Sequence, residues 1–248
     1  MYSFKKFIQE YDMDKIDPKL GYHDDLNPKI WDGQRLRPKV AHALERIADE
    51  FIEYLELSYS AIKDIIITGS NCGFNYTPLS DIDLHLVVDF SQGEVCPSCT
   101  GDFIADCFQA KKALWNSMHD ITIYGYDVEL YAQDAAEKHI APGVYSIMNR
   151  EWVIAPVFNK PTYDSFSVKA KAGEIMDAID SFVESESDDV ASIKELKDKI
   201  RKMRQAGLLD RGLYSVENLA FKTLRNNGYL EKLSNYLRSI EDKSLSLE

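Results

Sequence analysis

Two aspartates, Asp81 and Asp83, interrupt a stretch that otherwise has the pattern of a buried β-strand. Every second residue from Ile82 to Val88 is apolar. Residues two apart in a strand share a face, so the two carboxylates should lie roughly 6–7 Å apart on the side opposite the apolar residues. At an effective dielectric constant near 20 they would repel each other by about 2–3 kcal/mol. The pattern therefore predicts a strand with one core face and one cation-binding face.

A second short strand precedes this one. The β-branched run Ile65–Thr68 ends at Gly69-Ser70, and the loop Asn71–Ser80 leads to Asp81. A glycine allows a tight turn, and the amides and the serine hydroxyl that follow it can bind phosphate oxygens. Ser70 is equally suited to cap a helix. Gly69 and Ser70, followed by Asp81-Ile82-Asp83, thus predict a phosphate-binding turn beside paired carboxylates. Asn71 could touch a phosphate or ribose of a bound nucleotide, or could be a plain loop residue.

The two aspartates predict a centre for two Mg²⁺ or Mn²⁺ ions, because carboxylate oxygens are the hard ligands these cations prefer. In a two-metal site one carboxylate can bridge both ions, and a third acid on a neighbouring strand usually completes the set. The segment "YDVELY" offers Asp127 and Glu129 on one face. We favour Glu129, which stands between two apolar residues, and keep Asp127 as the alternative.

Taken together, the Gly-Ser turn, Asp81-Ile82-Asp83 and the later strand acid resemble the DNA polymerase β-like nucleotidyltransferase superfamily. The resemblance covers Ile65 to Leu130. Wider stretches also resemble uncharacterised nucleotidyltransferases of tailed bacteriophages; these are "LNPKIWDG", "SDIDLH", "DVELYAQD", "GVYSIMN" and "SVENLAFKTLR".

The resemblance implies a metal-dependent attack of an acceptor hydroxyl on the α-phosphate of a nucleoside triphosphate such as ATP, with release of pyrophosphate. It implies that Asp81 and Asp83 hold both metals and that Glu129 binds the metal nearest the acceptor. It also implies that Ser70 and the Gly69 backbone bind the β- and γ-phosphates. The acceptor could be an RNA end, a protein side chain or a small molecule. The resemblance does not indicate which base is preferred.

Hydrophobic periodicity predicts an α+β fold. We expect helices over 38–57 and 103–118, with strands over 65–68, 81–88, 121–131 and 144–154. Gly125 would be a bend or bulge in the third strand. About four helices follow, and no strand. The expected domains are an N-terminal arm over 1–37, a nucleotidyltransferase core over 38–163 (a small mixed sheet flanked by helices) and a helical bundle over 164–248.

Charge is unevenly distributed along the 248 residues. Residues 164–248 hold 14 Lys and Arg against 16 Asp and Glu, a balance of −2, which leaves −10 of the total −12 in residues 1–163. This excess argues against a long nucleic-acid footprint on the catalytic part. The sequence has no apolar run long enough for a transmembrane helix and no secretory signal at its start, so we expect a cytoplasmic protein that does not bind membranes, in the host cytoplasm if it is of phage origin.

Other residues could bind a ligand but are explained as well by a structural role. Cys96 and Cys99 form a C-x-x-C pair to which Cys107 could add a third zinc ligand, but reduced thiols in a surface loop are favoured. His85 shares the face of the two aspartates and could reach the ligand, although a structural role is favoured.

Two aromatic residues and one basic segment also have both a functional and a structural explanation. Tyr76 and Tyr145 could stack on a base, and packing is favoured for both. The basic segment Lys194–Arg204 could attract an RNA end or a triphosphate, or could simply be a solvated helix face. The alternative function for the whole chain is a catalytically silent module that senses nucleotides or binds a partner. Silent relatives of the superfamily commonly lack one or more of the metal ligands.

Overall fold

The computed structural model describes residues 16–90, 101–139, 141–159 and 161–247. They form two compact units, which we call the sheet unit (residues 21–159) and the helical unit (the segment ending at Leu20 together with residues from 160 onward). None of the described helices is both long enough and apolar enough to cross a membrane.

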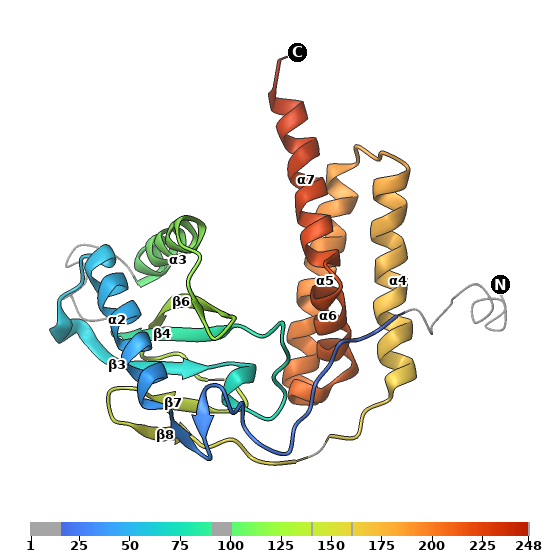
Figure 1. Ribbon diagram of the computed structural model, residues 1–248. Helices are drawn as coiled ribbons and strands as arrows, with labels where there is room; N and C mark the ends of the chain where they lie inside the picture. Colours follow the sequence, from blue (N-terminus) through green and yellow to red (C-terminus); the bar gives the residue numbers. More distant parts are fainter. Residues whose placement is uncertain (1–15, 91–100, 140, 160, 248) are drawn as a thin grey trace. The chain divides into compact units, whose positions relative to one another are not determined.

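A six-stranded mixed sheet forms the centre of the sheet unit, with the strand order β5-β6-β4-β3-β7-β8 (Figure 1). Only β4 and β6 run parallel, and the other neighbours are antiparallel. The strands are β3 (Ile62–Thr68), β4 (Ile82–Val88), β5 (Thr122–Ile123), β6 (Tyr126–Asp134), β7 (Val144–Ser146) and β8 (Glu151–Ile154). The mixed sheet confirms the predicted α+β class.

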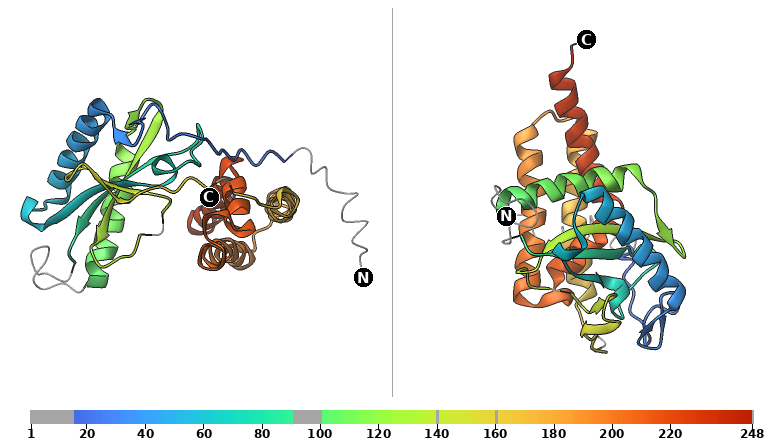
Figure 2. Two further views of the ribbon diagram at one scale, coloured as in Figure 1. Left: turned by 90° about the horizontal axis from the view of Figure 1, so that it is seen from below. Right: turned by 90° about the vertical axis from the view of Figure 1, so that its left-hand side faces the viewer.

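Helices α2 (Pro38–Leu55) and α3 (Gly101–Met118) cover one face of this sheet (Figure 2). Proline is tolerated at the first turn of α2, and the helix ends where Glu56 adopts the left-handed conformation. The two helices meet at the rings of Phe51 and Trp115, whose centroids are 5.4 Å apart. The alternating apolar residues of β4 point into the same core, so the polar residues of this strand lie on the other face.

The segment 121–131 differs from its prediction. It is a hairpin of β5 and β6, in which Ile123 pairs with Tyr126, and not one bent strand. Tyr124 and Gly125 both have positive φ, 52° and 85°. Two successive positive-φ residues are typical of the tight turns that reverse a chain between antiparallel strands. Similarly, the segment 144–154, in which the sequence indicated one possible strand, is the hairpin of β7 and β8.

Residues 21–37 pack within the sheet unit, although the sequence suggested that they belong to an arm. They form a short hairpin of β1 (Trp31–Asp32) and β2 (Arg35–Leu36). Leu26 and Ile30 join Trp31 in the core. The apolar residues of this segment have no regular spacing, so periodicity alone did not indicate their burial.

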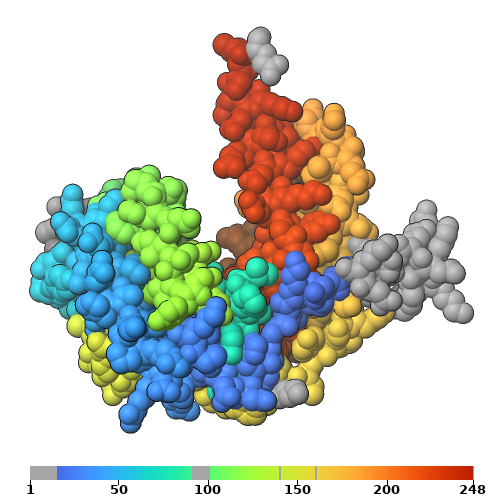
Figure 3. Space-filling model, in the orientation of Figure 1, coloured from blue at the N-terminus to red at the C-terminus, as the bar shows by residue number. Residues whose placement is uncertain are grey.

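Within its described residues, the helical unit contains four α-helices, in line with the expected number: α4 (Ser165–Glu184), α5 (Val190–Asp210), α6 (Val216–Asn226) and α7 (Tyr229–Leu245). Asp164, Asp189 and Ser215 cap the first three through their side chains. The helices enclose a core of their own, and Ile16 from the N-terminal segment packs against it. The last turns of α7 extend beyond the other helices (Figure 3), where Leu245 is exposed.

Candidate active site

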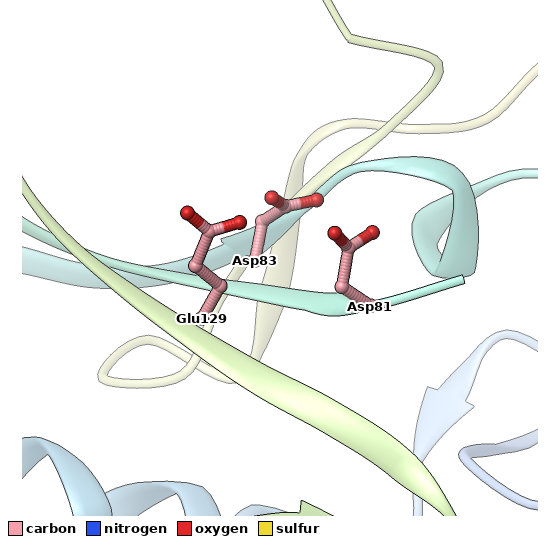
Figure 4. A group of neighbouring side chains, drawn as sticks. All are labelled: Asp81, Asp83 and Glu129. Atoms are coloured by element: carbon pink, nitrogen blue, oxygen red, sulfur yellow. The ribbon is translucent and has the colours of Figure 1, made fainter. Parts of the chain in front are cut away.

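Three carboxylates meet on the polar face of the sheet (Figure 4). Asp81 directly precedes β4, Asp83 lies within it, and Glu129 lies on β6. Because the parallel register places Asp83 beside Glu129, the two side chains leave the sheet on the same side. One oxygen of each of the three carboxylates lies within 4.8 Å of the others, and all three residues are half-buried. The group has the composition and spacing of a divalent-cation site.

Bringing these acids together is electrostatically costly. At 4.8 Å and an effective dielectric constant of 20, each pair of charges repels by about 3.5 kcal/mol, and solvent reduces this value because the residues are partly exposed. A cation between the carboxylates would reverse the sign of the interaction. The donor set therefore fits one or more hard divalent ions.

Lys112 provides one positive charge beside the acids. Its Nζ lies 2.8 Å from Glu129 Oε1, and the lysine side chain is only 19% exposed. The same ammonium lies 5.0 Å from the centre of the Tyr131 ring. Sequence reasoning missed this residue. One available signal was its place on α3, four residues after the buried Phe108 and three before the buried Trp115, where a lysine borders the core.

The turn after β3 is shaped to admit Asp83. Gly69 has φ 81° and ψ −165°, a conformation that essentially only glycine adopts. A Cβ atom at this position would lie 1.8 Å from Asp83 Oδ2. The glycine thus removes both backbone strain and a direct clash with a predicted metal ligand.

Ser70 begins η3 (Ser70–Cys72), which is one 3₁₀ turn and not the start of an α-helix. Its hydroxyl donates to Ser80 Oγ at 2.8 Å, and Ser80 Oγ also accepts the Thr77 amide at 2.9 Å. The Gly-Ser turn is therefore bonded to the end of the loop that leads into β4. Ser70 as a whole is half-buried.

Asn71 is buried and holds the backbone at Asp81 in place. Its Nδ2 donates to the Asp81 carbonyl at 2.8 Å, and its Oδ1 accepts Asn27 Nδ2 at 2.8 Å. Its main-chain carbonyl accepts the indole of Trp31 at 2.7 Å. Both ends of the side chain are thus bonded within the protein. The predicted contact between Asn71 and a nucleotide is not supported by this geometry, and the residue instead fixes the backbone of Asp81.

His85 continues the polar face of β4 but lies outside the acidic group. Its Nδ1 is 2.8 Å from Gln133 Oε1, and its ring packs against Tyr131 with the centroids 5.1 Å apart. Burial lowers the pKa of its imidazole. These contacts agree with the structural role that was favoured for His85.

Asp127 also lies apart from the three acids. It is exposed and pairs with Thr122 in the hairpin. Among the described residues, the carboxylates that gather closely enough to share an ion are those of Asp81, Asp83 and Glu129. The structure thus favours Glu129 over Asp127 as the third acid.

A pocket of about 420 Å³ opens beside the acids, between the start of β4, the end of α3 and the β5–β6 hairpin. Asp81 and Glu129 form part of its wall. The other charged or polar residues that line it include Asn116, His119, Asp120 and Asp127. All of its lining residues are described, and none is a lysine or arginine. The pocket is large enough for a small molecule and carries negative charge.

The other candidate residues have packing roles or lie elsewhere. Tyr76 stacks on His23 with the centroids 3.9 Å apart, and Tyr145 is buried against Trp31. Cys107 is exposed on α3, while Cys96 and Cys99, for which reduced thiols were favoured over zinc ligands, lie outside the described residues.

No protein-family model matches the sequence, and no curated protein matches it significantly. Among solved structures, it is similar to the STING-associated CdnE c-di-GMP synthase from Capnocytophaga granulosa. The alignment has 12% sequence identity and a TM-score of 0.21, and covers 96% of this chain and 91% of the other. A likeness at this level supports no inference about fold or function.

Proposed function

We propose that this protein is a metal-dependent nucleotidyltransferase that moves a nucleoside monophosphate from a nucleoside triphosphate to an acceptor hydroxyl. The observation that carries the proposal is the group formed by Asp81, Asp83 and Glu129, with one oxygen of each within 4.8 Å of the others. The Gly69-Ser70 turn next to this group supplies the second half of the expected site.

In this proposal Asp81 and Asp83 hold two Mg²⁺ or Mn²⁺ ions, and Glu129 is the third ligand on the acceptor side. When bound, such ions activate an attacking hydroxyl and neutralise charge on a leaving pyrophosphate. The acceptor oxygen forms a bond to the α-phosphorus while the bond from that phosphorus to the α,β-bridging oxygen breaks. Glu129 borders the pocket, and its proposed role is to accept the hydroxyl proton.

The Gly69-Ser70 turn is proposed to bind the β- and γ-phosphates. Ser70 would supply a hydroxyl and Gly69 a main-chain amide, while the missing side chain at Gly69 leaves the space that Asp83 Oδ2 occupies. Asn71 contributes indirectly, because its bond to the Asp81 carbonyl keeps the start of β4 beside this turn.

The charge of the neighbouring pocket indicates which class of acceptor would fit there. A nucleic-acid end would bring phosphates against Asp120 and Asp127, and the pocket wall has no lysine or arginine to hold them. The acidic wall therefore favours the hydroxyl of a small molecule or of a protein side chain as the acceptor.

Activity is tested by incubating the protein with each labelled nucleoside triphosphate, Mg²⁺ or Mn²⁺, and a cell lysate, followed by pyrophosphate assay and mass spectrometry of the products. We expect one product heavier by a nucleoside monophosphate. Asp81→Asn with Asp83→Asn should abolish its formation, whereas Asp24→Asn with Asp25→Asn changes the charge equally at exposed positions and should not.

Calorimetry separates the two functions that the sequence allows. Metal-dependent nucleotide binding without pyrophosphate release from any triphosphate would favour the silent nucleotide-binding module. Binding that is unchanged in the variant with Asp81→Asn and Asp83→Asn would refute the assignment of the site itself.

A further inference from the structure

The basic segment of α5 borders a groove in the helical unit. The groove lies between α5, α6 and α7 and has a volume of about 540 Å³. Lys194, Lys197, Arg201 and Arg204 line it from α5 at intervals of three and four residues, so they follow one face of the helix. This face is the basic stretch whose role the sequence left open.

The groove carries a charge opposite to that of the whole chain. Its lining residues include the four cationic side chains and one acid, Asp198, a balance of +3, whereas the whole protein carries −12. Some of these charges have partners: Lys194 pairs with Glu241 at 2.7 Å and Arg201 with Asp198 at 2.6 Å. Exposed ion pairs of this kind contribute little to stability, so a carboxylate of another molecule can compete for these cations.

The floor of the groove is apolar, which a merely solvated helix face would not explain. Leu208, Phe221 and Leu230 are only half-buried there, and Leu233 lies beneath them. The Arg204 guanidinium covers the one aromatic ring of the floor, with its central carbon 4.4 Å from the ring centroid. The remaining floor is aliphatic, so it suits aliphatic side chains better than stacked nucleobases.

We propose that this groove binds an acidic amphipathic helix of a partner protein. Leucine-like side chains of that helix would fill the aliphatic floor, and its glutamates or aspartates would face the basic rim. From Lys194 to Leu208 the rim extends for about 21 Å, the length of a helix of about 14 residues. This proposal is independent of the proposed nucleotidyltransferase activity.

The test uses the full chain and a fluorescein-labelled peptide of about 15 residues, with leucines at helical spacing on one face and glutamates on the other. Fluorescence anisotropy should show saturable binding that weakens as salt is raised. A peptide with lysines in place of the glutamates should bind at least about tenfold more weakly, because it is repelled by the rim.

Two matched pairs of variants locate the binding. Lys197→Glu should weaken it about fivefold, whereas Lys199→Glu, on the same helix but away from the groove, should not. Leu208→Ser should weaken it about tenfold, whereas Leu209→Ser, an exposed neighbour that does not line the groove, should not. Thermal unfolding of each variant verifies that it is folded.

Three outcomes would overturn the proposal. They are the absence of saturable binding of the acidic peptide, equal effects of the groove variants and their controls, and tighter binding of a single-stranded oligouridylate than of the peptide. The last result would identify the groove as a nucleic-acid site.

Discussion

Substituting Gly69 by alanine should displace Asp83, one of the proposed metal ligands, while the fold is kept. The new Cβ would lie 1.8 Å from Asp83 Oδ2, and ordinary contacts begin at 3.4 Å, so the carboxylate must move by about 1.6 Å to reach an ordinary contact. Metal–ligand distances tolerate about 0.2 Å. Loss of a residue that only supports a metal ligand typically weakens metal binding by about 10–100-fold. Displacing Asp83 itself should weaken Mn²⁺ binding by at least this factor.

The same substitution also strains the backbone. Alanine at φ 81° and ψ −165° should cost about 1–3 kcal/mol of unfolding free energy. Gly33→Ala is a suitable control in the same unit, because Gly33 also has positive φ, 58°, but an added Cβ there meets nothing within 4 Å. It should lower stability without changing Mn²⁺ affinity.

The assay is a titration of free Mn²⁺ by electron paramagnetic resonance, with unfolding measured in parallel by denaturant. If Gly69→Ala remains folded and binds Mn²⁺ like the wild type, the proposed role of Asp83 is refuted. A double-mutant cycle with Asp83→Ala tests the clash directly. Shortening Asp83 removes the colliding oxygen, so the two stability changes should not be additive.

Three other perturbations test the surroundings of the site. Lys112→Met should strengthen Mn²⁺ binding about fivefold in the same titration, because an ammonium beside Glu129 repels the ion by about 1 kcal/mol; unchanged affinity would contradict this. Asn71→Ala should lower the unfolding free energy by about 2–3 kcal/mol in urea, since two hydrogen bonds with buried groups are lost, and a loss below 0.5 kcal/mol would exclude a positioning role. Burial raises the pKa of the Cys72 thiol well above its usual value, so in the native protein maleimide should modify the exposed Cys107 much faster than Cys72 at pH 8; equal rates by peptide mass spectrometry would show that Cys72 is accessible.

The local pattern of the sequence predicted most elements of the fold and the two aspartates of the site. Apolar residues at every second position defined the core face of β4, and a period of 3–4 residues defined the helices. It did not predict that residues 121–131 reverse direction at Tyr124 and Gly125, because one glycine is compatible with either a bulge or a turn.

The tertiary structure decided how the strands pair and what supports the acids. A period of two fixes which face a side chain occupies, but neither the neighbouring strand nor the register. The sequence therefore favoured Glu129 but left Asp127 as an alternative, whereas the parallel pairing of β4 with β6 places Asp83 beside Glu129. Lys112 reaches the site because α3 packs against β6. The local pattern of α3 places this lysine at the border of the core but does not show that Glu129 lies opposite it. The type and face of the acids thus follow from local chemistry, whereas their meeting within 4.8 Å depends on long-range pairing of the backbone.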